Sequence, residues 1–191
     1  PPGTYDRILS DGEFVKLLKE AGYIEAMDPN EYNMGDLFDE YAHFDAHWMG
    51  DSLYSVIVRF GYLGVSFNTE IISHEEASDY NILWDSKLKG KVGHFDWHLP
   101  NLGCLSLRDG NDSPSPFDIN SSQWSQLQET TLSLKPQVGG YFDYGGTFAS
   151  LKNGEIYAMC GIGDWITGVV RKDGAPVDSV IPKQGGIQWK E

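Results

Sequence analysis

The sequence predicts an α/β fold with a mostly parallel sheet, and three observations support this. From residue 90 onward, short apolar runs alternate with segments of helical periodicity. Hydrophobic residues make up 40% and aromatic residues 13% of the 191 residues, which is the composition of a chain with a packed core. Glycine turns at residues 145–146 and 161–163 lie between an apolar run and a helical segment, as in strand-to-helix connections of α/β proteins.

The N-terminal part of the chain predicts one clear helix. Residues 13–21 carry apolar side chains at the i, i+3, i+4 and i+7 positions of an amphipathic helix. Ser10 or Asp11 can cap this helix, and Gly22 ends it. The acidic, aromatic segment that continues to Trp48 is expected to form short helical turns and loops.

Apolar periodicity also predicts the remaining helices and strands. Two β-branched runs around Gly61 predict two successive strands, at residues 53–60 and 63–67. On the helix that opens at residue 121, one face is expected to carry Trp124, Leu127, Thr131 and Leu134. The other expected elements are helical turns at 73–89, strand 90–95, helix 101–108, a polar loop at 109–116, strand 138–142, helix 147–152, strand 156–160, helix 164–171 and strand 179–181.

The charge of the chain excludes two classes of partner. Asp and Glu number 28 and Lys and Arg 14, which gives a formal net charge of −14. Nucleic acids and anionic membrane surfaces require a basic face, so neither is expected to bind. The longest apolar stretches, residues 54–67 and 156–163, are shorter than the ~20 residues of a membrane-spanning helix, so the chain is not expected to span a membrane.

Two local features leave alternatives open. The N-terminal residues 1–6 lack an initiator Met, a basic region and an apolar region, so they are expected to be neither a signal peptide nor a natural start. Cys104 and Cys160 can form one disulfide or remain two buried thiols, because no spacing motif decides between them.

Three polar residues at the end of one predicted strand suggest a metal site. His94, Asp96 and His98 alternate, so on an extended strand they project from one face, and they are ligand types for Zn²⁺. The favoured alternative is that they line a cleft or face water, because no fourth ligand is evident. His43 and His47 would align on a helix but lack the glutamate of the zinc-protease motif.

The glycine turns are weak cofactor signals. Gly161 and Gly163 precede a predicted helix, but the third glycine of a dinucleotide-binding turn is missing. The turn instead predicts a helix start that another group approaches closely, with Asp164 as a possible cap. No nucleophile elbow or catalytic triad is present in the sequence, so we expect no enzyme activity and no cofactor.

Several segments, taken in order, resemble the periplasmic solute-binding proteins of ABC importers, and most of all the spermidine/putrescine-binding branch. The resemblance covers essentially the whole chain. The segments that carry it are Tyr5-Asp6, residues 17–24 (LLKEAGYI), residues 54–68, residues 83–92 (LWDSKLKGKV), Leu134-Lys135-Pro136, Asn153-Gly154-Glu155-Ile156 and residues 180–189 (VIPKQGGIQW).

This resemblance implies two α/β lobes, joined by crossing strands near residues 64–69 and 180–189, that enclose a small ligand. Residues 1–66 would be a partial first lobe with a crossing strand, residues 67–181 the second lobe, and residues 182–191 the start of the return crossing. By the same resemblance the chain is expected to be truncated, because the family's opening strand–helix–strand and long C-terminal return have no counterpart in it.

The resemblance also implies the partners. They are a small-molecule ligand, namely a polyamine-like amine or related organic ion, and an ABC transporter permease, in a periplasmic or extracytoplasmic location. The truncated chain is a possible dimer, since a missing strand would leave an exposed sheet edge. The alternatives are a ligand-sensing module without transport, or a metal-binding, hydrolase-like site at His94, Asp96 and His98.

In the family, aromatic side chains stack on the ligand's methylene chain and carboxylates hold its ammonium groups. Trp189 and Glu191 match the tryptophan and acid that follow the family's double glycine, whereas His98 and Asn101 stand where acids are expected. Arg59 stands where aromatic residues are usual, and it can pair with an anionic ligand or with a surface acid. The expected ligand-binding residues are Asp11, Arg59, Asp96, Trp97, His98, Tyr144, Thr147, Asp164, Trp165, Trp189 and Glu191.

Overall fold

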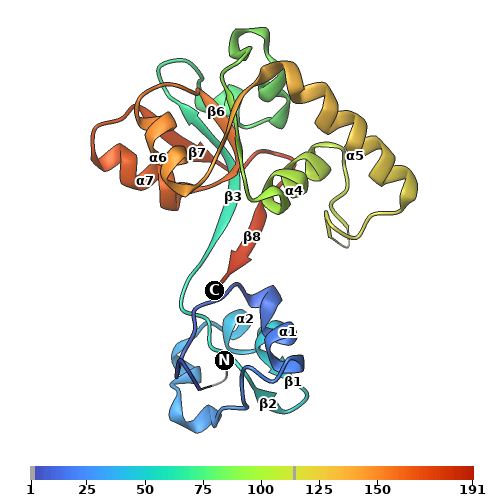
Figure 1. The fold of residues 1–191 in the computed structure, drawn as a ribbon, viewed down its shortest axis with the longest axis vertical. Coiled ribbons are helices and arrows are strands. Elements are labelled where there is room, and N and C mark those ends of the chain that lie inside the picture. The colour runs from blue at the N-terminus through green and yellow to red at the C-terminus, as the bar shows by residue number, and fades with distance from the viewer. Residues whose placement is uncertain (1–2, 114) are drawn as a thin grey trace. The chain divides into compact units, whose positions relative to one another are not determined.

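The computed structural model describes residues 3–113 and 115–191. Pro1, Pro2 and Pro114 lie outside the described residues, and with them the first two positions of the N-terminal segment and one position of the polar loop expected at 109–116. The chain divides into two compact units (Figure 1). Unit 1 comprises Pro1–Gly61 with Trp189–Glu191, and unit 2 comprises Tyr62–Gln188.

Unit 1 consists of short elements. The helix predicted at 13–21 is confirmed as a 3-10 turn, Gly12–Phe14, that continues into α1, Val15–Glu20. A second short helix, α2 (Asp39–Ala42), precedes a small antiparallel pair of β1 (Trp48–Met49) and β2 (Ser52–Leu53). The buried residues of this unit include Val15, Tyr41 and Leu53.

The strand predicted at 53–60 is wrong. Only Ser52 and Leu53 are paired as β2, and the next strand, β3, begins at Phe60 and runs to Asn68. The backbone N–H groups of Val58 and Arg59 instead both donate to the Glu191 carbonyl oxygen, at 2.8 and 3.0 Å. These two backbone N–H groups are therefore hydrogen-bonded to the last residue of the chain rather than within a regular strand ladder.

Unit 2 contains a mixed sheet with the strand order β5-β4-β6-β3-β7, and β8 (Ile187–Lys190) pairs with β3. β4 is parallel to β5 and to β6, whereas β3 is antiparallel to β6 and to β7. The α/β class is thus confirmed. The prediction of a mostly parallel sheet is wrong, because β3 runs antiparallel to β6 and to β7. The remaining strands are β4 (Val92–Phe95), β5 (Val138–Phe142), β6 (Ala158–Ile162) and β7 (Val177–Val180).

Glycines allow β3 to continue where the sequence predicts a break. A Cβ atom at Gly61 would lie 2.7 Å from the Trp189 Nε1 atom, and one at Gly64 would lie 2.3 Å from the Val180 carbonyl oxygen. Any larger residue at either position would clash with a neighbour that is distant in sequence, so glycine is required there. Neither glycine ends the strand.

The helices of unit 2 cover both faces of the sheet. Figure 1 shows α6 (Tyr144–Lys152) and α7 (Asp164–Lys172) on one side, and α4 (His98–Arg108) and α5 (Ser121–Leu134) on the other. α4 and α6 begin three residues earlier than predicted. The expected turns between Ser73 and Lys89 contain α3 (His74–Ala77) and two 3-10 turns, Tyr80–Trp84 and Ser86–Leu88.

The buried face of α5 differs from its prediction by one position. Leu127, Thr130 and Leu134 are buried, whereas the Trp124 side chain is 46% exposed and Thr131 is only partly buried. The Thr130 hydroxyl donates to Asp109 Oδ2 at 2.7 Å, so a polar contact brings this residue inward where apolar periodicity selected Thr131.

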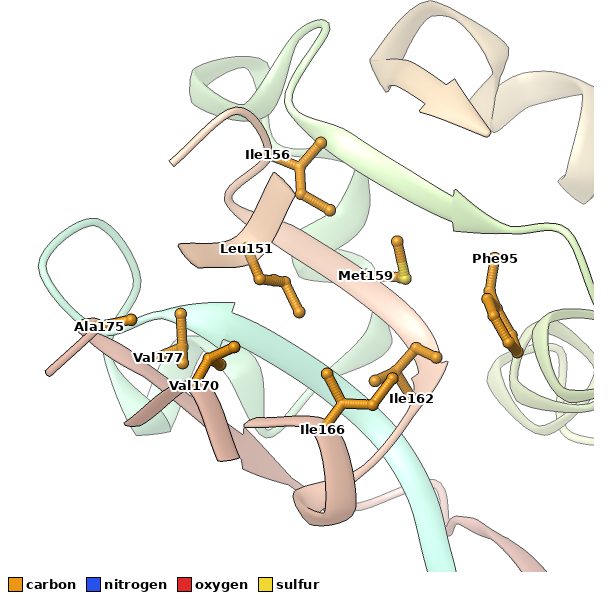
Figure 2. Packing of buried hydrophobic residues seen from close by; sticks show 9 residues of the cluster. All are labelled: Phe95, Leu151, Ile156, Met159, Ile162, Ile166, Val170, Ala175 and Val177. Atoms are coloured by element: carbon orange, nitrogen blue, oxygen red, sulfur yellow. The ribbon is translucent and has the colours of Figure 1, made fainter. Parts of the chain in front are cut away.

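The core between the sheet and helices α6 and α7 is apolar (Figure 2). Its members are Phe95, Leu151, Ile156, Met159, Ile162, Ile166, Val170, Ala175 and Val177. Burying each of the larger side chains stabilises the fold by about 1.5–3 kcal/mol. Within the residues that the structure describes, no helix combines the length and apolar character needed to cross a membrane.

We predict that Gly64→Ala destabilises the protein by about 2–4 kcal/mol, because the added methyl group would overlap a backbone oxygen that cannot move independently. The control is Gly168→Ala in α7, where a Cβ atom meets nothing within 4 Å. It should be neutral or stabilising by up to ~1 kcal/mol. Urea unfolding measures both, and an equal effect of the two substitutions would contradict the packing argument.

Candidate functional site

Three strand ends meet at one edge of the unit 2 sheet. β4, β5 and β6 run parallel, and Phe95 at the end of β4 is paired with Phe142 at the end of β5. Each strand is followed within a few residues by a helix, α4, α6 or α7. The carboxyl ends of parallel strands are where open α/β sheets bind ligands, so this edge is the candidate site.

Aromatic rings from two of these connections, together with rings of β4 and α6, form a cluster at the edge. The Tyr144 ring lies 4.8 Å from the Trp165 ring and 5.4 Å from the Phe95 ring, measured between centroids. The Phe148 ring lies 6.4 Å from that of Trp165. Phe95 is buried, whereas the Tyr144 side chain is 54% exposed, so the cluster extends from the core to the surface.

Carboxylates accompany the rings at all three connections. Asp96, Asp143 and Asp164 each lie just beyond one of the three strands, and all three residues are exposed. Asp143 caps α6, because its Oδ1 atom accepts a hydrogen bond from the Gly146 N–H at 2.7 Å. Asp164 is in the first turn of α7, where a negative charge interacts favourably with the helix dipole.

A buried amide holds the first connection in place. The Asn101 side chain is fully buried, and its Nδ2 atom donates to the carbonyl oxygens of Phe95 and Trp97, both at 3.1 Å. The Asp96 N–H donates to the Phe142 carbonyl oxygen at 2.9 Å. Asn101 therefore fixes the turn that presents Asp96, Trp97 and His98, and its own amide lies inside the protein.

Two histidines meet beside this turn. The His94 Nε2 and His98 Nδ1 atoms are 3.2 Å apart, and the His94 ring lies 5.2 Å from the Tyr141 ring. Burial, and secondly the nearby His98, lowers the pKa of His94 below its ordinary value. His94 is therefore neutral at pH 7, and no positive charge is held at this end of the edge by that ring.

The proposed three-residue metal site at His94, Asp96 and His98 is wrong. Among residues 3–113 and 115–191, no group of three or more His, Cys, Asp or Glu side chains is arranged to hold a metal ion. The alternation that suggested it fails because β4 ends at Phe95, so Asp96 no longer follows the strand's period.

Thr147 lies within α6 at this edge, and a hollow extends from Trp165 along α7. Thr147 is fully buried, and its hydroxyl donates to the Asp143 carbonyl oxygen at 2.8 Å. Asp164 and Trp165 line a hollow of about 570 Å³ along α7, together with Gly168, Val169, Arg171 and Lys172. The edge thus offers aromatic faces and carboxylates at its surface, and Thr147 supports them from within.

The other four expected ligand residues lie together in unit 1. Arg59 Nε forms an ion pair with Glu191 Oε2, and the Arg59 guanidinium lies 5.6 Å from the Trp189 ring centroid. Burial, and secondly Glu13 and Glu191, raises the pKa of Asp11 against the opposing effect of Arg59. The positive charge of Arg59 is therefore balanced by the carboxylate of Glu191.

Trp189 occupies the space that Gly61 leaves open, and its Nε1 atom is buried without a hydrogen-bond partner among the described residues. The unit 2 edge and this unit 1 group are the two places where the structure gathers the expected site residues.

The sequence of residues 4–190 matches the family of bacterial extracellular solute-binding proteins. The chain belongs to this family. Among curated relatives, the spermidine/putrescine-binding periplasmic protein 1 of Haemophilus influenzae is 25% identical over 197 residues, which cover 98% of this chain and 50% of that protein. The spermidine/putrescine-binding periplasmic protein of Escherichia coli is 22% identical over 194 residues, covering 99% and 53%.

Solved structures show the same fold. The spermidine/putrescine ABC transporter substrate-binding protein of Streptococcus pneumoniae superposes with a TM-score of 0.78 at 14% identity, covering 94% of this chain and 54% of that chain. A lipoprotein of Treponema pallidum superposes with a TM-score of 0.76 at 17% identity, covering 95% and 56%. The chain spans about half the length of the curated relatives that it matches.

Sequence reasoning missed several residues of this candidate edge. Asp143 was not selected, although an Asp that precedes Tyr-Gly-Gly at a helix start is a recognisable cap signal. Phe95 and Phe148 are not among the expected site residues either. Their contacts with Tyr144 and Trp165 depend on the pairing of distant strands, so no local pattern indicates them.

We predict that Asp143→Ala lowers the free energy of unfolding by about 1 kcal/mol, because the N-terminus of α6 loses its side-chain acceptor. The matched control, Asp143→Asn, keeps a side-chain oxygen and should change stability by only a few tenths of a kcal/mol. Urea unfolding distinguishes the two, and equal losses would contradict the capping role.

We also predict that His94 titrates below the ordinary histidine pKa of 6.5 in an NMR titration. His98→Gln should raise the His94 pKa only in part, because burial, the larger cause, remains. The unfolded chain binds this proton more readily than the folded one, so the contribution of His94 to stability falls as pH drops below 6.5 and returns as pH rises. A His94 pKa at or above 6.5 would contradict the prediction.

Proposed function

We propose that this protein is the substrate-binding receptor of an ABC importer and that it captures a small organic cation of the polyamine type. The single observation that supports this best is the edge of unit 2, where carboxylates and aromatic rings lie at three adjacent strand ends. The relatives named as spermidine/putrescine-binding proteins support the same ligand class.

The chemistry of the edge suits an alkylammonium ion. Asp96 and Asp164 are exposed and supply negative charge for charge-assisted hydrogen bonds to N–H donors. Tyr144 is exposed and Trp165 partly buried, and aromatic rings attract a cation and also contact a methylene chain. A ligand with both an ammonium group and an apolar stem uses both features.

The electrostatics of the chain favour a cation over an anion. The formal net charge is −14, which attracts positive solutes toward the surface and repels negative ones. The lowered pKa of His94 keeps that ring neutral at pH 7, so it does not oppose a bound ammonium group. The anionic ligand that Arg59 suggested in the sequence has less support, because Arg59 pairs with Glu191.

The residue assignments form part of this proposal. We assign the rings of Tyr144 and Trp165 to ligand packing, and Asp96 and Asp164 to ammonium binding. The further proposed ligand residues are Trp97, His98 and Thr147 of unit 2, and Asp11, Arg59, Trp189 and Glu191 of unit 1.

The cellular context follows from the same proposal. A receptor of this kind works outside the cytoplasm and delivers its ligand to a membrane permease. The family comprises solute-binding proteins rather than enzymes, so we propose that the ligand is released unchanged. Turnover of a bound amine by the purified protein would contradict this.

We predict that Asp164→Asn and Trp165→Ala each weaken spermidine binding by about 10- to 100-fold, because one removes a charge and the other a ring face. Isothermal titration calorimetry on the folded protein measures this. The control is Trp124→Ala on α5, whose exposed ring lies on a helix that follows no strand end, and it should bind as the parent does.

A second titration, with a linear dicarboxylate of similar length, should give no heat of binding. Unchanged spermidine affinity in both site variants, or tighter binding of the dicarboxylate than of spermidine, would overturn the proposed ligand class.

A further inference from the structure

The two cysteines of the chain are buried in the interior of unit 2. Cys104 lies in α4 and is fully buried, and Cys160 lies in β6 with an exposed fraction of 2%. They are the only cysteines among the 191 residues. The structure describes both as free thiols, and neither takes part in the candidate site.

The backbones that carry these cysteines approach each other closely. Gly161 has a φ of +75°, and a Cβ atom there would lie 2.9 Å from the Pro100 carbonyl carbon and from the Asn101 nitrogen. β6 therefore runs directly against the first turn of α4 without a side chain between them. The Cys160 Sγ atom lies 3.7 Å from Asn101 Oδ1, and Cys104 stands at the i+3 position from Asn101 in α4, on the same face of the helix.

The thiols interact with each other. Burial raises the pKa of the Cys104 thiol, but its interactions with Cys160, with Tyr80 and with the Gly161 N–H lower that pKa overall. The interaction with Cys104, and secondly burial, raises the pKa of Cys160. In the folded protein, the Cys104 thiol therefore has a lower pKa than the Cys160 thiol.

We propose that Cys104 and Cys160 form a disulfide that ties α4 to β6. Two cysteines on closely packed backbone segments, in a family of extracellular proteins, have the environment in which such bonds persist. The oxidant is a small disulfide or a dithiol oxidase. One cysteine thiolate attacks the oxidant's disulfide and releases its first thiol. The second cysteine thiolate then attacks the mixed disulfide and releases the other. The protein loses two protons and two electrons, which reduce the oxidant to two thiols.

This bond would act on the elements that build the candidate site. α4 begins directly after Trp97, and β6 leads through Gly163 to Asp164 and Trp165. Linking them closes the long loop between residues 104 and 160 and restricts the unfolded chain, so the folded state is favoured. The bond is independent of the proposed ligand, and its test does not require one.

Both thiols are buried in the folded protein, so an oxidant cannot reach them there. The experiment therefore lets the disulfide form while the protein refolds. The protein is unfolded with reductant and refolded either with reduced and oxidised glutathione or with dithiothreitol. We expect no free thiol by Ellman titration in denaturant after the first refolding, and both thiols after the second. Peptide mapping should recover the fragment that links Cys104 to Cys160. The oxidised protein should unfold at a temperature roughly 5–15 °C higher than the reduced protein.

The matched control is Cys160→Ala, whose unfolding temperature should be the same in both buffers. Two free thiols, titrated in denaturant after refolding with glutathione, would overturn the proposal. A mass gain from bound glutathione or a covalent dimer on a non-reducing gel would overturn it as well. If Cys160→Ala fails to fold, the thiol count and the linked peptide of the parent protein still decide.

Discussion

The parallel pairing of β4 with both β5 and β6 is the constraint on which the rest of unit 2 depends. It sets three strand ends side by side, so the connections after Phe95, Phe142 and Ile162 leave the sheet at one edge. Each connection then enters a helix that packs back on the sheet, and the apolar core between the sheet and helices α6 and α7 draws its buried side chains from β4, β6, β7 and those two helices, with the turns beside them (Figure 2). The exposed rings and carboxylates are carried by segments whose positions are already fixed from below.

Much of this fold could be predicted because its signals are local. β5 and α7 follow from apolar periods and from the glycine turns beside them, and their predicted ranges match within one residue. β3 was predicted as two strands because glycines usually weaken a strand. Its continuity depends on Val180 and Trp189, which lie far away in the sequence. The antiparallel direction of β3 also depends on long-range pairing, which no periodicity contains.

The candidate site could also be predicted from the sequence only in part. Asp164 and Trp165 were expected because a glycine turn precedes a helix there, and the structure places them at a strand end. The cluster of Tyr144, Trp165 and Phe95 could not be derived from spacing, since it joins three separate elements, α6, α7 and β4. The metal hypothesis failed for a related reason. Alternation predicts a common face only while the backbone remains extended, and β4 ends before Asp96.

The Asn101 amide separates the shape of the first connection from its surface chemistry. Its two N–H donors satisfy the carbonyl oxygens on either side of Asp96, so the turn is held by backbone groups that every residue type possesses. Positions 96 to 98 are then open to substitution without loss of the turn. In the proposed site, acids, histidines and aromatic residues could therefore be exchanged at these three positions, which would change the solute preference on an unchanged scaffold.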